Sequence, residues 1–137
     1  MLLRINVWIS CNGFKDSSFK DRPFPYVALS PSSRKKSEFR NISDVHNELI
    51  NLSDEAEKKG FKVGEAIYSQ SFYFADHKLL VSSDQQDQIK AYRFCKTFSC
   101  PPHQSLQDTP IKIIDDFLII DEECNNFLNK KKEDSNA

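Results

Sequence analysis

Apolar residues recur at helical spacing between residues 43 and 60, where consecutive members lie four, three and four positions apart. This spacing places them on one face of a helix. Ser43 offers a hydroxyl that can cap the first turn, and Gly60 can adopt the left-handed conformation that ends a helix. The pattern predicts a helix from Ser43 to Gly60, with an apolar stripe formed by Val45, Leu49, Leu52 and Ala56.

Several other stretches show the alternation or the short apolar blocks that are typical of strands. In residues 2–10, Leu3, Ile5, Val7 and Ile9 alternate with more polar positions. Shorter blocks follow Pro25 and Gly60. In the second of these, either Gly64 forms a bulge that turns Glu65 outward, or Glu65 faces an apolar layer. The predicted strand regions are 2–10, 26–29, 61–67, 72–75, 79–81 and 111–120.

Three further segments complete the predicted layout. Residues 30–37 are rich in Ser and basic residues, which indicates a mobile surface loop. Residues 83–98 fit either a helix or a strand, and the capping pattern that begins at Ser83 slightly favours the helix. Asp115 and Asp116 suit a tight turn, and a closing helix is predicted for residues 121–129.

Together these elements predict an α+β fold, with an antiparallel or mixed sheet of about five to seven short strands and two or three helices packed on one face. The 137-residue length fits a single domain. We expect that domain to cover residues 1–129, and we expect residues 130–137 to form a disordered, charged C-terminal tail.

Composition adds a charge gradient to this picture. The net charge is only −1, but residues 1–40 carry eight Lys and Arg against three Asp and Glu, whereas residues 101–137 carry four against eight. Such a gradient is consistent with two faces that meet different partners, but the interpretation we favour is that these charges partly cancel in the fold. The 11 Phe residues indicate a core dominated by aromatic packing.

The chain has four cysteines, at positions 11, 95, 100 and 124. Its first residues lack the pattern of a secretory signal. We therefore expect a cytoplasmic protein with reduced thiols and no membrane association. Thiolate and imidazole groups are the preferred ligands of zinc, so Cys95, Cys100, His103 and Cys124 form a candidate zinc site. Their spacing departs from the usual knuckle of two Cys separated by two residues.

Two pairs of residues could support a small enzyme. Cys100 and His103 are close enough in sequence to act as nucleophile and base, although nothing nearby supplies an orienting group. Glu65 and His77 could form an acid/base pair if the predicted strands around them pair. Ordinary loop and turn roles for these residues compete with both hypotheses.

An acidic cluster supports the leading functional hypothesis. The chain has no Gly-x-x-x-x-Gly-Lys loop, so an ATPase interpretation of this cluster fails. We instead expect a non-enzymatic protein-binding domain, of the inhibitor, immunity-protein or adaptor kind, that docks an acidic C-terminal face on a basic partner such as a nuclease. The candidate contact residues are Asp115, Asp116, Asp121, Glu122 and Glu123.

A basic segment provides a further alternative, a zinc-stabilised nucleic-acid-binding module. Basic side chains could contact phosphates while nearby aromatic rings stack on bases. The overall pI of about 6.3 argues against a dedicated nucleic-acid domain. The basic residues concerned are Arg34, Lys35, Lys36 and Arg40.

Overall fold

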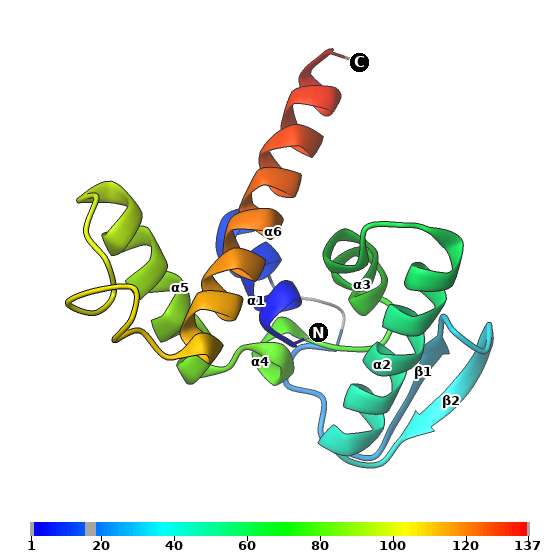
Figure 1. The fold of residues 1–137 in the computed structure, drawn as a ribbon. Coiled ribbons are helices and arrows are strands. Elements are labelled where there is room, and N and C mark those ends of the chain that lie inside the picture. Colours follow the sequence, from blue (N-terminus) through cyan, green and yellow to red (C-terminus); the bar gives the residue numbers. More distant parts are fainter. Residues whose placement is uncertain (1, 16–18, 137) are drawn as a thin grey trace.

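Helices dominate the fold in the computed structural model, which describes residues 2–15 and 19–136 (Figure 1). Within those residues there are six helices and one two-stranded antiparallel sheet. The elements in chain order are α1 (Leu2–Asn12), β1 (Tyr26–Ser30), β2 (Lys35–Phe39), α2 (Ile42–Lys59), α3 (Val63–Ser71), α4 (His77–Leu80), α5 (Ser83–Thr97) and α6 (Ile111–Asn136).

Helix α1 is the element around which the others pack. Ile5, Trp8 and Ile9 contribute to an apolar cluster shared with the hairpin, α2, α3 and α4. Leu3 and Val7 contribute to a second cluster shared with α5 and α6. Because one short helix supplies both clusters, the molecule has two cores joined through α1.

The predicted strand at residues 2–10 is therefore wrong, and the burial of α1 explains why. Leu3, Ile5, Val7 and Ile9 alternate in sequence, but Asn6 and Trp8 between them are buried as well. A helix that is enclosed on nearly all sides shows no amphipathic period. The apparent alternation arises because Arg4 and Asn6 interrupt an otherwise apolar run at every second position.

The hairpin β1–β2 replaces the mobile loop that was predicted for residues 30–37. The strands pair antiparallel with Tyr26 opposite Phe39. Glu48 of α2 secures the turn, because its carboxylate accepts hydrogen bonds from the Ser30 hydroxyl at 2.7 Å and from the Ser32 backbone N–H at 2.8 Å. The short strand predicted at 26–29 is present, and it extends by one residue to Ser30.

Helix α2 confirms the strongest prediction from the sequence. Its buried residues include all four members of the predicted apolar stripe, and Gly60 ends it with φ of 74°. The N-cap differs from the prediction by two positions. Asn41, rather than Ser43, accepts a hydrogen bond from the Asp44 backbone N–H at 3.1 Å.

The prediction of an α+β fold with five to seven strands is wrong. Residues 63–71 and 77–80 form α3 and α4 in place of strands, and Gly64 lies inside α3 rather than in a bulge. Residues 111–136 form one continuous helix, α6, that includes the predicted turn at Asp115 and Asp116. The apolar runs that suggested strands are instead helix segments buried against several neighbours, and short buried runs cannot be distinguished by periodicity alone.

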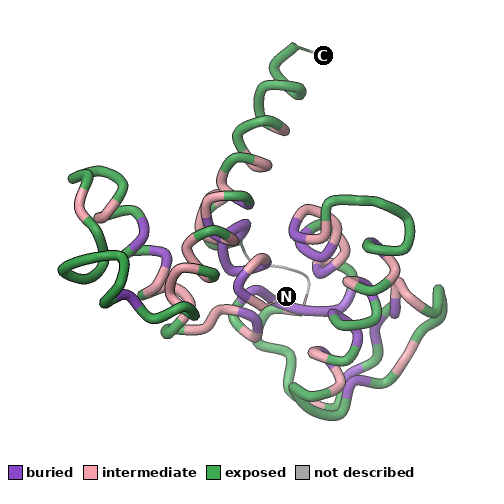
Figure 2. The backbone as a smooth tube through the Cα atoms, in the orientation of Figure 1, coloured by how far each residue is buried: buried purple, intermediate pink, exposed green. Residues whose placement is uncertain are grey.

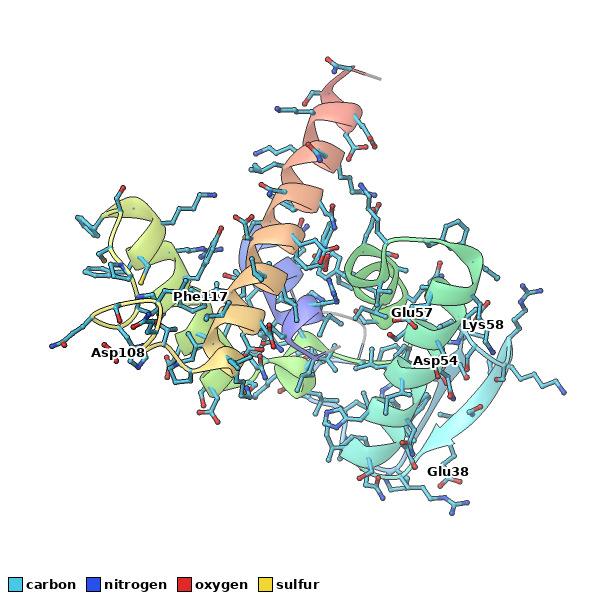
Figure 3. The ribbon with its side chains drawn as sticks, in the orientation of Figure 1. Glu38, Asp54, Glu57, Lys58, Asp108 and Phe117 are labelled. Atoms are coloured by element: carbon cyan, nitrogen blue, oxygen red, sulfur yellow. The ribbon has the colours of Figure 1, made fainter. Side chains whose placement is uncertain are left out.

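Helices α5 and α6 run parallel to each other. The Gln88 side-chain amide donates a hydrogen bond to Asp116, and the Tyr92 hydroxyl donates one to Asp121. Residue numbers therefore increase in the same direction along both helices. Phe117 lies between the two helices, where its ring meets that of Tyr92 edge-on at 5.7 Å (Figure 3). The helical interpretation of residues 83–98 is thus confirmed, with Ser82 as the N-cap.

The C-terminal part of α6 extends beyond the body of the molecule (Figures 1 and 2). Helix continues through Asn136, and residues 131–136 are exposed, whereas the sequence predicted a disordered tail from residue 130; residue 137 lies outside the described residues. Among the described residues, no helix combines the length and the apolar character needed to cross a lipid bilayer.

Candidate ligand pocket

A pocket of about 510 Å³ opens where α1, α3 and α6 meet. This volume lies in the range of natural small-molecule sites, which are mostly apolar and carry a few polar groups. Aromatic rings form much of the wall, and one thiol and several charged side chains lie at its edge. The lining residues are Trp8, Cys11, Asn12, Glu65, Tyr68, Ser69, Phe72, Phe127, Lys130, Lys131 and Asp134.

Helical periodicity explains how the chain brings these side chains together. On α3 they occupy positions 65, 68 and 69, followed by Phe72 at its C-cap, and on α6 positions 127, 130, 131 and 134. Both sets have the spacing of one helix face. Trp8 and Cys11, which lie about one turn apart on α1, complete the wall.

The aromatic wall is held by ring contacts between all three helices. The ring centroid of Trp8 lies 5.8 Å from that of Tyr68 and 5.7 Å from that of Phe127, which it meets edge-on. Tyr68 and Phe72 also meet edge-on, at 5.3 Å. Tilted and edge-on pairs at these distances are favourable because of the ring quadrupole, and they fix the rings in place.

An ion pair crosses the rim. Lys130 Nζ donates to Glu65 Oε1 at 2.7 Å, and this hydrogen bond raises the pKa of Lys130. The two side chains are 44% and 32% exposed, so the pair contributes little to stability. It does set the relative position of α3 and α6 at the pocket mouth.

Behind the wall lies the buried carboxylate of Glu123, which is 1% exposed. Asn126 donates to its Oε1 at 3.1 Å and Arg4 approaches at 3.7 Å, but burial dominates and raises the pKa of Glu123. Among the described residues, Glu123 Oε2 and Trp8 Nε1 make no hydrogen bond of normal geometry, but the Trp8 side chain is close enough to the carboxylate to oppose the rise of its pKa. Gly64 makes room for this carboxylate, since a Cβ at position 64 would lie 1.8 Å from Oε2.

A pair of thiols flanks the same region. Cys11 of α1 and Cys124 of α6 interact through their side chains, and Arg93 Nη2 lies 3.9 Å from Cys11 Sγ. The interaction with Cys124 and the charge of Arg93 outweigh burial and lower the pKa of Cys11 to about 7. The same interaction raises the pKa of Cys124.

His77 is buried on the other side of Tyr68 and Phe72, and its ring centroid lies 4.7 Å from that of Phe72. Neither ring nitrogen has a hydrogen-bond partner among the described residues. Burial lowers the pKa of His77, while the charge of Asp76 acts in the opposite direction. The Glu65–His77 acid/base pair that the sequence suggested is not formed. Glu65 pairs with Lys130 at the pocket rim, whereas His77 is buried among aromatic rings.

A second hollow, of about 460 Å³, lies between the hairpin turn, α2 and α3. Its wall includes three exposed apolar side chains, Leu29, Phe61 and Tyr73, and its rim carries Arg34 and Lys59. It has fewer convergent aromatic rings than the α1–α3–α6 pocket.

The five acidic residues predicted to form a docking face all lie on α6, but they point in different directions. Glu123 is buried, and Glu122 pairs with Arg4 on α1 at 3.1 Å. Asp116 accepts from Gln88 and Lys112, and Asp121 from Tyr92. Asp115 is exposed. Four of the five carboxylates therefore serve contacts within the chain.

The candidate zinc ligands are divided between two places. Cys95 interacts with Cys100 at the end of α5, whereas Cys124 lies beside Cys11. His103 is exposed in the loop that leads to α6. Residues 2–15 and 19–136 contain no group of three or more His, Cys, Asp or Glu side chains positioned to hold a metal ion.

The basic residues predicted to contact nucleic acid lie on the hairpin. Arg34 occupies the turn with φ of 61°, Lys35 and Lys36 are exposed on β2, and Arg40 follows that strand beside Glu38. This surface is on the side of the molecule away from α5 (Figure 1).

Apart from Glu65, the pocket residues were not identified as a site from the sequence, because they come together only if residues 2–12 and 63–71 are helices. Once α3 is read as a helix, the 65, 68, 69, 72 spacing is visible in the sequence. The single Trp, three residues before a Cys, was the remaining signal. Comparison of the chain with protein-family models, with curated proteins and with solved structures finds no significant match.

Proposed function

We propose that this protein is a non-enzymatic binding domain whose partner places an apolar, ring-bearing group in the α1–α3–α6 pocket. The observation that carries the proposal is the convergence of Trp8, Tyr68, Phe72 and Phe127 around a cavity of about 510 Å³. Aromatic walls bind flat apolar groups through dispersion and edge-to-face contacts.

The expected partner is another protein, which would supply an aromatic side chain as its anchor. Aromatic anchors in well-packed pockets carry much of the binding energy at protein interfaces. A free aromatic compound presents the same chemistry, so both sources are covered by this proposal. The pocket replaces the acidic residues of α6 as the proposed docking site, because most of those carboxylates are engaged within the chain.

The rim favours a partner without a strong net charge. Glu65 and Lys130 neutralise each other, and Lys131 and Asp134 add one charge of each sign. A ligand with a polar substituent on an apolar ring could therefore leave the substituent at the mouth and place the ring inside.

The test uses Trp8, which is the single Trp of the chain, as an internal donor. Anilinonaphthalenesulfonate serves as the aromatic probe, and energy transfer from Trp8 reports its arrival. Phe72→Ala removes a wall of the pocket, whereas Tyr73→Ala removes the neighbouring ring, which lines the other hollow. We expect Phe72→Ala to weaken probe binding about ten-fold or more, equivalent to roughly 1.4 kcal/mol, and Tyr73→Ala to leave it unchanged.

The opposite pattern would move the binding site to the hollow beside the hairpin and contradict the proposal. Ser69→Gln gives a second variant, since Ser69 is exposed at the pocket mouth and a longer side chain there narrows the entrance. Competition then separates the two sources of the ring. Displacement of the probe by free indole and by a Trp-containing peptide compares a small compound with a protein segment.

A further inference from the structure

The four cysteines of the chain are sorted by the fold into two neighbouring pairs, Cys11 with Cys124 and Cys95 with Cys100. The pairs differ in their surroundings. Cys95 and Cys100 lie near the end of one helix, whereas Cys11 and Cys124 come from two different helices that pack against each other.

Three features of the Cys11–Cys124 pair favour thiol chemistry. The two side chains pack against the same apolar cluster and interact with each other. The guanidinium of Arg93 lies 3.9 Å from Cys11 Sγ, where it stabilises negative charge. Cys11 also lines the α1–α3–α6 pocket, so a small reagent can reach it. Cys124 is partly buried behind it against the apolar cluster of α1, α5 and α6.

We propose that Cys11 and Cys124 form a redox-active thiol pair, in which a peroxide oxidises Cys11 and Cys124 resolves the product to a disulfide that links α1 to α6. This chemistry does not depend on whether the pocket binds a ring. It gives the pocket region a covalent modification site that the binding role does not require.

Each step balances in atoms and electrons. The Cys11 thiolate attacks one oxygen of the peroxide, the S–O bond forms as the O–O bond breaks, and the leaving hydroxide takes a proton to become water. Two electrons pass from sulfur to the peroxide. Cys124 then attacks the Cys11 sulfur, the S–S bond forms as the S–O bond breaks, and the departing hydroxide leaves as water with the Cys124 proton. A dithiol reductant reverses the bridge.

The identity of the reactive thiol can be tested on the unmodified protein. Trypsin places all four cysteines in separate peptides, 5–15, 94–96, 97–112 and 113–130, so mass spectrometry follows each one. We expect iodoacetamide at pH 7 to label Cys11 at least about five-fold faster than Cys95. At pH 7 a half-ionised thiol has roughly fifty times the thiolate fraction of a thiol with an ordinary pKa of about 9. The thiolate of the low-pKa thiol is also less nucleophilic, which offsets about ten-fold of this advantage.

Arg93 is tested with a matched control on the same helix. Arg93 and Lys90 are both exposed on α5, and only Arg93 contacts Cys11. Arg93→Gln should shift the pH midpoint of Cys11 labelling upward, whereas Lys90→Gln should leave it near pH 7. Equal rates for Cys11 and Cys95 in the unmodified protein would overturn the proposal.

The resolving step is tested with hydrogen peroxide followed by peptide mapping. The expected product is a cross-link between peptides 5–15 and 113–130 that disappears on treatment with dithiothreitol. Cys124→Ser should leave Cys11 as a sulfenic acid that dimedone traps, and Cys95→Ser should not alter the cross-link. A dominant bridge between Cys95 and Cys100, with Cys11 still reduced, would also overturn the proposal.

Discussion

Asn6 is the side chain that fixes α1 to the second half of the chain. It is fully buried, and its Nδ2 donates to the carbonyl of Leu80 at 3.0 Å. Its Oδ1 accepts from the backbone N–H of Ser82 and from Gln86 Nε2, both at 3.1 Å. A buried polar group is tolerated when its hydrogen bonds are made, and here they also define where α1 sits.

We predict that Asn6→Ala lowers the free energy of unfolding by about 2–4 kcal/mol, because the backbone groups of Leu80 and Ser82 lose their partners in a buried site. Asn12→Ala is the matched control. Asn6 donates to the Leu2 carbonyl at 2.9 Å, and Asn12 donates in the same way to the Trp8 carbonyl at 2.8 Å, which is on its own helix. Its loss should cost less than about 1 kcal/mol in urea unfolding. Equal costs would contradict the role given to Asn6.

His77 makes stability depend on pH in a defined direction. Burial lowers its pKa in the folded state below the usual 6.5, with Lys15 acting in the same direction and Asp76 against it. The unfolded chain then binds more protons in this window, so stability is present above about pH 6.5 and is lost as the pH falls.

We predict that His77→Phe reduces the loss of stability between pH 7 and pH 5, since the ring remains among Phe14, Tyr68 and Phe72 but cannot be protonated. Urea unfolding at the two pH values measures the difference. The exposed His103 gives the control, and His103→Gln should leave the pH dependence of the parent protein unchanged. A larger loss in His77→Phe would show that the imidazole is stabilised by protonation.

At the scale of elements, α3 and α6 pack closely where the carboxylate of Glu123 on α6 meets Gly64 on α3, which has no side chain. Glu123 occupies the space above Gly64, so this glycine is required for close packing rather than for a turn. A methyl group at this position would force the buried Glu123 to move.

We predict that Gly64→Ala destabilises the protein by about 1–3 kcal/mol despite the higher helix propensity of Ala. Truncation of the partner in Glu123→Ala removes the clash, so Gly64→Ala in that background should be neutral or stabilising. A double-mutant cycle from thermal or urea unfolding gives the coupling, which should exceed about 1 kcal/mol. Additive effects would mean that the two residues are not in contact.

The elements differ in how well the sequence predicted them. Helix α2 has one buried face and one exposed face, on which Asp54 and Lys58 lie (Figure 3), so its period was visible. Helices α1 and α3 are short and buried on several sides, and the pattern that distinguishes a helix from a strand is lost there. For α6, the pair Asp115–Asp116 suggested a turn, but both residues continue the helix.

The candidate site, like the helices, could be predicted only where its signal is local in the sequence. The acidic residues of α6 were identified from local sequence, but their partners Arg4, Gln88 and Tyr92 lie on other helices. The aromatic pocket and the Cys11–Cys124 pair need contacts between residues more than fifty positions apart, which one sequence does not reveal. Local chemistry was predictable, whereas its juxtaposition depended on the packing of α1.

At the scale of the molecule, two apolar clusters share α1. The hairpin, α2 and α3 lie on one side of it and α5 on the other, while α6 packs along α1 (Figure 1). Because Trp8 and Val7 belong to different clusters but to one turn of one helix, the loss of either cluster exposes the other.

We predict that the two halves unfold as one cooperative unit. Leu49→Ala in the first cluster and Ile89→Ala in the second should each cost about 2–5 kcal/mol. In both variants, Trp8 fluorescence and far-ultraviolet circular dichroism should report the same urea midpoint. A variant in which helix signal persists after the Trp8 transition would show that the clusters are independent.

The pocket proposal is tested most directly at Trp8 itself. Because the chain has a single Trp, incorporation of fluorotryptophan places one fluorine in the pocket wall. Titration with indole, followed by fluorine NMR, should move or broaden that resonance in a saturable manner, and Phe72→Ala should reduce the effect while Tyr73→Ala preserves it. A resonance that stays unchanged while indole or anilinonaphthalenesulfonate binds to the protein would place the site elsewhere and contradict the proposed function.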